Sequence, residues 1–308
     1  MKKKITVIGA GNVGATLAQL IVQSGLADVA LYDIVEGVPQ GKALDLSEAS
    51  PLWGSSSSVI GTNSFSETEN SDIIVVTAGF PRKPGMSRDD LLNANAKVIS
   101  EVVGKSSKAS PHAVIIVVTN PMDVMAQLSL TVSGFAPHKV IGMGGILDSA
   151  RFRTFVAWEL GVSAEDVEAL VLGGHGDLMV PMPRFTTVRG ISIPQILSKE
   201  RIDALVQRTR NGGAEVVGLL KSGSAYYAPA AATFQMLKAI VLNEKRLLPC
   251  AAYLNGEYGF SNVYAGVPVI MGSAGVDRIV DLELNDEERK DFDKSVAAVR
   301  SLVEQILR

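Results

Sequence analysis

Residues 4–14 read KITVIGAGNVG, a short β-branched run that leads directly into a glycine-rich turn. The turn fits the pattern G-x-G-x-x-G, in which the glycines allow a tight turn, close approach of the backbone to a pyrophosphate, and close helix–strand packing. A helical pattern follows from Val13 to Ser24, so the unpaired N–H groups at the start of that helix would face the phosphates. We expect the turn to be lined by Gly9, Ala10, Gly11, Asn12, Val13 and Gly14.

An acidic residue follows the second predicted strand at the distance that such a site requires. Residues 29–32 form that strand, and Asp33 lies 19 residues after Gly14, close to the roughly 20 expected for an acid that binds ribose hydroxyls. Asp33 alone also fits a strand-end turn. A carboxylate here would repel a 2′-phosphate, and residues 34–36 contain no arginine to offset that repulsion. The ordered set of strand, turn, helix, strand and acid therefore predicts an NAD site rather than an NADP site.

The rest of the chain divides into two regions of different pattern. Continuous apolar runs at 73–77 and 113–119 are typical of parallel strands covered on both faces, with helices forming right-handed crossovers. Helical patterns over 147–160, 198–220 and 286–307 dominate the second half, with a break or bend expected near Gly212 and Gly213. We predict an α/β fold: a Rossmann doubly wound parallel sheet in residues 1–145, then an α+β catalytic domain in residues 146–308.

Composition and charge narrow the classes of partner. A net charge of −3 without a Lys/Arg block gives no support for nucleic-acid binding. Cys250 is the single cysteine, too few for an internal disulfide or a zinc cluster. The uncharged stretch 258–276 is interrupted by Gly, Ser, Asn and Pro, and glycines interrupt the apolar run after the N-terminal lysines. We expect a cytoplasmic protein that binds neither nucleic acid nor membrane.

The three histidines differ in their sequence contexts. His112 and His138 each follow a proline in a polar turn, and we expect both at the surface. His175 lies between glycines in GGHGD (173–177), directly after an apolar run, where a backbone can approach a ligand closely. Because a histidine in a tight turn is often structural, its partners must decide its role.

Asp148 and Arg151 are the candidate partners of His175. They lie three residues apart on a predicted helix and therefore share one face. A carboxylate beside His175 would orient the imidazole and favour its charged form, and an arginine can bind a carboxylate bidentately. The same spacing also fits a local surface ion pair, so spacing alone leaves both interpretations open.

Five segments together resemble the lactate/malate dehydrogenase family over essentially the whole chain. They are GAGNVG (9–14), TAGFPRKPGMSR (77–88), VTNPMDVM (118–125), LDSARFR (147–153) and GGHGD (173–177). The resemblance is closest to the bacterial branch of malate dehydrogenases built like lactate dehydrogenase. It implies NAD as cofactor, hydride transfer between a 2-hydroxy acid and a 2-oxo acid, no metal, and a homo-oligomer, either a dimer or a tetramer.

The resemblance also implies roles for matching positions. His175 is expected to exchange the substrate proton while Asp148 orients it, and Arg151 is expected to bind the C1 carboxylate. Arg88 is expected to polarise the carbonyl when the loop at about 80–90 closes. Further cofactor contacts are expected from Asn95, Val118, Thr119 and Asn120, the last of which would also touch the substrate.

Two positions bear on the choice of substrate within the family. Arg82 occupies the position where lactate dehydrogenases typically carry glutamine. Oxaloacetate has a second carboxylate to pair with it, whereas pyruvate would leave a buried guanidinium unpaired, at a cost of about 3–5 kcal/mol. Ala225 matches a pocket position that is usually threonine in lactate enzymes, which leaves room for a larger substrate. Both residues favour malate and oxaloacetate.

Three alternatives follow from other interpretations of the same residues. A lactate or broad 2-hydroxyacid dehydrogenase of this fold is disfavoured by Arg82. A catalytically inactive NAD-sensing protein would be expected to lack the His/Asp/Arg set, whereas this chain has all of its members: His175, Asp148, Arg151 and Arg88. A metal- and NAD-dependent glycosidase of this architecture would need a Cys–His metal pair, and Cys250 has no histidine nearby in sequence.

Overall fold

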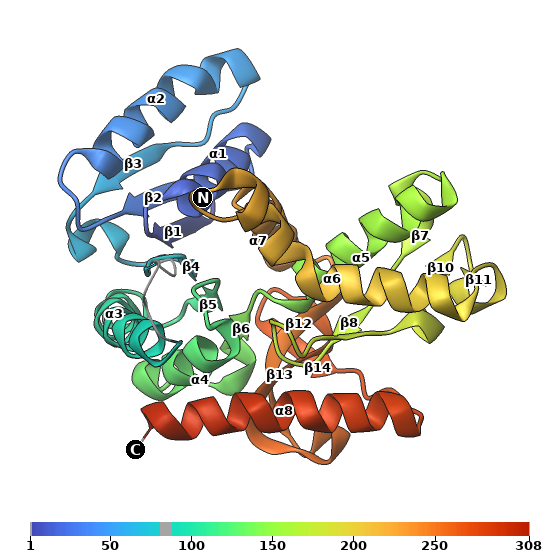
Figure 1. The fold of residues 1–308 in the computed structure, drawn as a ribbon. Coiled ribbons are helices and arrows are strands. Elements are labelled where there is room, and N and C mark those ends of the chain that lie inside the picture. Colours follow the sequence, from blue (N-terminus) through green and yellow to red (C-terminus); the bar gives the residue numbers. More distant parts are fainter. Residues whose placement is uncertain (1, 81–87, 308) are drawn as a thin grey trace.

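The structure is a computed structural model that describes residues 2–80 and 88–307, apart from the side chain of Arg88. Within these residues one mixed sheet runs through the molecule, with helices on both faces (Figure 1). The first half contributes strands β1 (Lys4–Ile8), β2 (Asp28–Tyr32), β3 (Val59–Thr62), β4 (Ile73–Val76), β5 (Val114–Val117) and β6 (Val140–Gly142). Its helices are α1 (Asn12–Ser24), α2 (Val38–Trp53), α3 (Arg88–Ala109) and α4 (Met122–Ser133).

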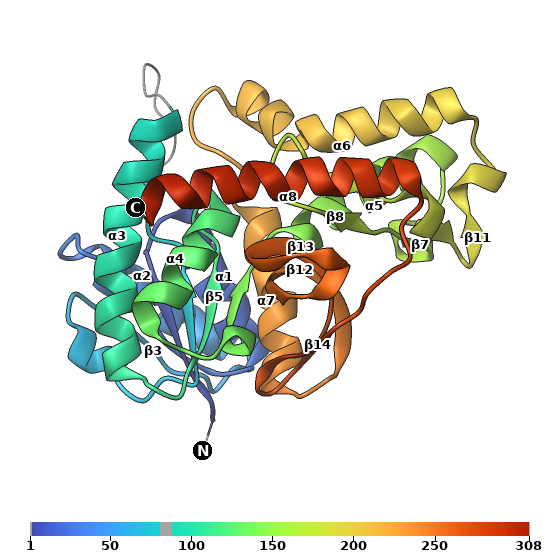
Figure 2. The same ribbon diagram turned by 90° about the horizontal axis from the view of Figure 1, so that it is seen from below.

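The first six strands form the parallel part of the sheet, in the order β3-β2-β1-β4-β5-β6. Strand order reverses between β1 and β4, as is usual in dinucleotide-binding sheets. Right-handed crossovers place α1 and α2 on one face and α3 and α4 on the other (Figures 1 and 2). Strands β4 and β5 are buried along their whole length, as their uninterrupted apolar sequences predict. The predicted Rossmann sheet is confirmed.

The second half combines helices with two long strands, β12 and β13, and several shorter ones. Its helices are α5 (Gly145–Leu160), α6 (Lys199–Leu220), α7 (Tyr227–Val241) and α8 (Asp286–Ile306). Its strands are β7 (Val167–Glu168), β8 (Val171–Leu172), β9 (Val180–Pro181), β10 (Thr187–Val188), β11 (Ile191–Ser192), β12 (Arg246–Asn255), β13 (Ser261–Gly272) and β14 (Gly275–Ile279). Strands β7 and β8 belong to two small antiparallel sheets that lie beside α5.

An antiparallel extension joins the two halves of the chain. Strands β12, β13 and β14 continue the main sheet beyond β6, with Ala251 opposite Gly142. The uncharged stretch noted in the sequence is mostly β13, which is buried from Val263 to Val269. Because one sheet continues through both halves, the domain division at residue 145 stays a prediction.

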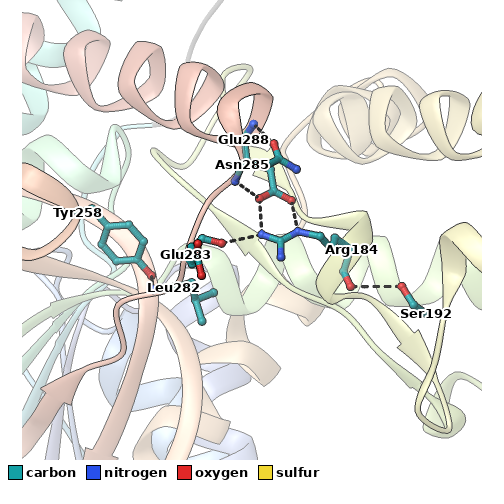
Figure 3. A network of polar contacts seen from close by, with 7 residues as sticks. All are labelled: Arg184, Ser192, Tyr258, Leu282, Glu283, Asn285 and Glu288. Atoms are coloured by element: carbon teal, nitrogen blue, oxygen red, sulfur yellow. Dashed lines mark hydrogen bonds and ion pairs between the residues drawn. The ribbon is translucent and has the colours of Figure 1, made fainter.

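Helix α8 lies along α4 and β13 and is fixed at its start by a polar network (Figure 3). Asn285 Oδ1 accepts from the Glu288 N–H at 2.9 Å, and Glu288 Oε2 accepts from the Asn285 N–H at 3.0 Å. This is the capping box that the sequence predicts. Arg184 donates to both carboxylate oxygens of Glu288, at 3.1 and 2.8 Å, and to the Glu283 carbonyl at 2.6 Å. These contacts fix the start of α8, whose later turns reach the candidate site.

Helix α6 differs from its prediction. It extends over nearly the predicted range but runs without a break through Gly212 and Gly213, so a break near these residues is wrong, while a bend there stays a prediction. Two glycines weaken a helix by about 1 kcal/mol each but do not end it, and the candidate site supplies a reason for their presence. Among the described residues no helix is both long and apolar enough to cross a membrane.

Candidate active site

The glycine-rich turn lies between the carboxyl end of β1 and the start of α1. Gly9 has φ of +104°, and a Cβ on Gly14 would lie 1.8 Å from the Gly9 carbonyl oxygen, so neither position accepts a side chain. Among the described residues no side chain caps α1, and its first turn contains no acid. The N–H groups at this helix start are therefore left for an outside acceptor, which fits the pyrophosphate of a dinucleotide.

Asp33 lies beside this turn, at the carboxyl end of β2. Its Oδ2 accepts from the Ala10 N–H at 2.7 Å, and its Oδ1 accepts from the Val35 N–H at 3.0 Å. The two bonds hold an acceptor at the carboxyl ends of neighbouring parallel strands, where α/β sheets bind ligands. The structure therefore brings together the turn and the acid that the sequence predicts as a cofactor site.

The segments after β4 and β5 meet next to the turn. Asn95 of α3 is 1% exposed; its Oδ1 accepts from the Phe80 N–H and its Nδ2 donates to the Asn120 carbonyl, each at 2.7 Å. Thr119 Oγ1 donates to the Ala78 carbonyl at 2.7 Å. Asn120 is exposed at this edge, whereas Val118 and Thr119 are buried. Asn95 thus ties two loops of the predicted cofactor site together, and its direct contact with a cofactor stays a prediction.

His175 and Asp148 meet although they lie far apart in the sequence. The His175 Nδ1 is 2.7 Å from Asp148 Oδ2, and Asp148 Oδ1 accepts from Arg151 Nη1 at 3.1 Å. Asp148 is 1% exposed, which excludes the interpretation of Asp148 and Arg151 as a surface ion pair. Since a buried carboxylate acts as acceptor, Nδ1 carries the proton in the neutral imidazole, and Nε2 keeps the lone pair that can accept a proton.

The surroundings of His175 shift its pKa. Burial disfavours the imidazolium, but the charge and hydrogen bond of Asp148, with a smaller contribution from Asp123, outweigh burial and raise the pKa of His175 above 6.5. Arg151 acts in the opposite direction and has the smallest effect. The group is therefore suited to exchange a proton near neutral pH.

Gly212 and Gly213 of α6 make room for the Arg151 side chain. A Cβ on Gly212 would lie 3.1 Å from Arg151 Cδ, and one on Gly213 would lie 3.6 Å from Arg151 Nη2. The arginine thus lies directly against glycine backbone, with Gly212 buried beneath it. This close approach explains a glycine pair inside a helix that the sequence pattern alone made us expect to break.

The turn that carries His175 is held by other elements of the fold. The His175 N–H donates to Asp123 Oδ2 of α4 at 2.7 Å, and the Gly174 N–H donates to Ser295 Oγ of α8 at 2.8 Å. Strand β13 adds two backbone hydrogen bonds to the same turn, each 2.9 Å long. Sequence reasoning missed Asp123 and Ser295. Asp123 had a usable signal, since an acid interrupts the apolar start of α4 inside the 118–125 motif; Ser295 had none.

The remaining predicted residues are placed as follows. Arg82 and the side chain of Arg88 lie outside the described residues, so their roles stay predictions. Ala225 is half-buried between α6 and α7. His112 and His138 are exposed, as predicted. Among the described residues no three His, Cys, Asp or Glu side chains gather as metal ligands would.

Two family models cover nearly the whole chain. The model described as lactate/malate dehydrogenase, NAD binding domain, matches residues 3–142, and that for the alpha/beta C-terminal domain of the same family matches residues 146–308. The chain belongs to the lactate/malate dehydrogenase family. The expected family and its NAD-binding domain are thereby confirmed.

Individual members of the lactate/malate dehydrogenase family are similar over almost their full lengths. Malate dehydrogenase of Rhodopirellula baltica is 58% identical over 304 residues, which are 98% of this chain and 96% of that protein. The crystal structure of Cryptosporidium parvum malate dehydrogenase matches with a TM-score of 0.97, 44% identity and 99% coverage of both chains. The lactate dehydrogenase of the same organism, complexed with lactic acid and nicotinamide adenine dinucleotide, matches with a TM-score of 0.96 and 41% sequence identity. The match covers 99% of this chain and 98% of that one. Because both activities occur on this backbone, side chains must decide between them.

Proposed function

We propose that this chain is an NAD-dependent malate dehydrogenase that oxidises (S)-malate to oxaloacetate and catalyses the reverse reduction. The observation that carries the proposal is the buried Asp148, which joins an imidazole at 2.7 Å and a guanidinium at 3.1 Å. This arrangement places a proton-exchanging group beside a cation that can bind a carboxylate. The 58% identity to a malate dehydrogenase over nearly the full length supports the choice of substrate.

Each group has one task in this reaction. Arg151 binds the C1 carboxylate and so orients C2, while Asp148 keeps the His175 Nδ1 protonated. The His175 Nε2 takes the proton of the C2 hydroxyl during oxidation and returns it during reduction. The glycine turn and Asp33 would hold NAD, which when bound accepts the hydride from C2. Arg82 binds the C4 carboxylate, and Arg88 polarises the carbonyl.

The deciding assay compares two 2-oxo acids with purified protein. The kcat/KM for NADH-dependent reduction of oxaloacetate is expected to exceed that for pyruvate by about 10²–10⁴, because an unpaired buried guanidinium costs about 3–5 kcal/mol. A preference for pyruvate would instead establish the lactate dehydrogenase alternative, since a lactate dehydrogenase of Cryptosporidium parvum has a similar backbone, with a TM-score of 0.96. NADH binding without turnover of either acid would favour the inactive NAD-sensing alternative.

The raised pKa of His175 predicts opposite pH dependences for the two directions. Malate binds productively to neutral His175, so its kcat/KM should rise as pH rises through the histidine pKa and then level off. Oxaloacetate needs the imidazolium, so its kcat/KM should be highest below that pKa and fall above it. Because Asp148 raises the pKa, both midpoints should lie above 6.5. Profiles of kcat/KM against pH in both directions test this, and a shared midpoint below 6.5 would contradict it.

Gly212→Ala is expected to weaken substrate binding through Arg151. The added methyl would lie 3.1 Å from Arg151 Cδ, so the arginine must move by a few tenths of an ångström. Misplacement of a substrate-positioning group by about 1 Å can cost 10²-fold in rate, so we expect a rise of about tenfold in KM for both dicarboxylates. Steady-state kinetics with saturating cofactor measures this change.

Gly218→Ala is the matched control on the same helix. Among the described residues, no atom apart from the nearby backbone of α6 lies within 4 Å of a Cβ at Gly218, which is exposed. The substitution should stabilise α6 by about 0.5–1 kcal/mol and leave KM unchanged. Equal changes of KM in both variants would show that stiffening of the helix, rather than displacement of Arg151, is responsible.

The proposal includes assembly into a homo-oligomer, either a dimer or a tetramer. Leu44 and Leu52 of α2 and Trp158 of α5 expose more than half of their surfaces, and exposed apolar residues in number often mark interfaces. Light scattering on the purified protein distinguishes a 32.6 kDa monomer from its multiples.

A further inference from the structure

The carboxylate beneath the His175 turn is unusual for a group that only holds a loop. Asp123 is 5% exposed, its Oδ2 accepts from the His175 N–H, and its Oδ1 has no hydrogen-bond partner among the described residues. Burial, opposed by the charge and N–H of His175, raises the pKa of Asp123 to about 6. A buried carboxylate with one unpaired oxygen is destabilising. Asparagine would accept the same hydrogen bond without the buried charge, so the charge needs an explanation.

The charged groups that act on this carboxylate belong to the candidate active site. They are His175, which favours the ionised form of Asp123, and Asp148, which disfavours it. Helix α8 contributes neutral groups beside Asp123, namely the side chains of Val299 and Ser295. Both lie next to Gly174: a Cβ added to this glycine would be 2.7 Å from Val299 Cγ2, and 3.6 Å from both Ser295 Oγ and Asp123 Oδ2. Asp123 therefore contacts the His175 turn directly, and the groups of α8 beside this contact are neutral.

His175 is affected from two sides. Asp148 contacts its ring nitrogen at 2.7 Å, and Asp123 contacts its backbone nitrogen at 2.7 Å. Both carboxylates stabilise the imidazolium, and Arg151 opposes them. The two acids come from different helices, Asp148 from α5 and Asp123 from α4.

We propose that Asp123 is a positioning residue of the acid/base centre: it holds the backbone of His175 and, through its negative charge, favours the imidazolium together with Asp148. This inference rests on the proposed role of His175 in the reaction. The inference predicts that the titrations of Asp123 and His175 are coupled, because the pKa of Asp123 lies close to the range in which a histidine changes charge. Protonation of Asp123 at acid pH removes part of the stabilisation of the imidazolium.

Histidine NMR tests this inference without turnover. The chain contains three histidines, and two of them are exposed, so ¹³C-labelled histidine gives one buried signal and two internal references. Asp123→Asn keeps an acceptor for the backbone N–H and removes the charge, so the titration midpoint of His175 should move to lower pH. Ser295→Ala removes the neighbouring neutral bond to the same turn and should leave the midpoint in place. An unchanged midpoint in Asp123→Asn, or an equal shift in both variants, would overturn the inference.

The titration curve of the unaltered protein provides a second test if Asp123→Asn does not fold. Its His175 signal should show an additional inflection near pH 6, where Asp123 changes charge. A single inflection would contradict the coupling. In active Asp123→Asn protein, the midpoint of the kcat/KM profile for malate should shift to lower pH in step with the NMR midpoint. If neither oxaloacetate nor pyruvate is reduced, the proposed function fails while the NMR result still decides the coupling.

Discussion

Replacing His175 with glutamine is expected to lower kcat/KM for malate and for oxaloacetate alike by about 10³–10⁴. General acid–base catalysis contributes about 10²–10⁴ to a rate, and a glutamine amide can bind the substrate oxygen but cannot exchange its proton. No other histidine can take over this role, because among the described residues, which include all three histidines, only His175 contacts Asp148. Steady-state kinetics in both directions, with NADH binding followed by fluorescence, measures the loss.

His112→Gln is the control for this substitution. His112 is exposed at the far end of β5 from the site, and the same change there should leave kcat/KM within twofold. The affinity for NADH should be retained in both variants, since the proposed cofactor site, made of the glycine turn and Asp33, does not include His175. A loss of less than tenfold in His175→Gln would mean that another group carries the proton and that the proposed mechanism is wrong.

The cofactor half of the site is predictable from sequence because its chemistry is local. The close approach of Gly14 to Gly9 and the bond between Ala10 and Asp33 involve residues joined by one strand–helix–strand unit. Each constraint therefore has a fixed spacing along the chain. The same holds for the pairing of Asn285 with Glu288, where both partners lie within one helical turn.

The catalytic half required the resemblance as well as the pattern. Their spacing places Asp148 and Arg151 on one face of a helix. It does not show that this face is buried, or that Asp148 contacts His175, which lies 27 residues later in the sequence. The packing of α5 against β8 brings these side chains together, and α4, α8 and β13 hold the turn that carries His175. A surface ion pair and a catalytic cluster share the same local sequence pattern.

Contacts between distant segments account for what the sequence did not reveal. Ser295 reaches Gly174 across 121 residues, and an ordinary serine on an amphipathic helix carries no mark of that contact. The sequence pattern predicts a helix break at Gly212, because the reason for a glycine there, the neighbouring side chain of Arg151, lies on another helix. Strand β13 forms most of the uncharged stretch 258–276, because it is buried from Val263 to Val269 against α4, α7 and α8, which are remote in sequence.

Arg82→Gln is expected to invert or erase the preference between the two 2-oxo acids. Arg82 lies outside the described residues, so the prediction rests on its position in the 77–88 motif and on the proposed pairing with the second carboxylate. Losing one partner of a buried ion pair costs about 3–5 kcal/mol, so kcat/KM for oxaloacetate should fall by about 10²–10⁴. Activity with pyruvate should rise, because glutamine leaves no charge unpaired beside the methyl group.

Lys83→Gln separates specific pairing from general attraction of the dianion. The substitution removes one positive charge, as Arg82→Gln does, but from the adjacent residue. Long-range attraction of a dianionic substrate depends on the net local charge. Salt screens this attraction, with a Debye length of about 8 Å at 0.15 M. If attraction dominates, both variants should lose oxaloacetate activity to a similar extent, and the loss should shrink at high salt. If pairing dominates, only Arg82→Gln should change the ratio of the two substrates, and salt should have little effect on that ratio. The closure expected for the loop at about 80–90 would exclude water and makes the second result the expected one, since a desolvated pair is little screened and pyruvate has no group to pair with the arginine.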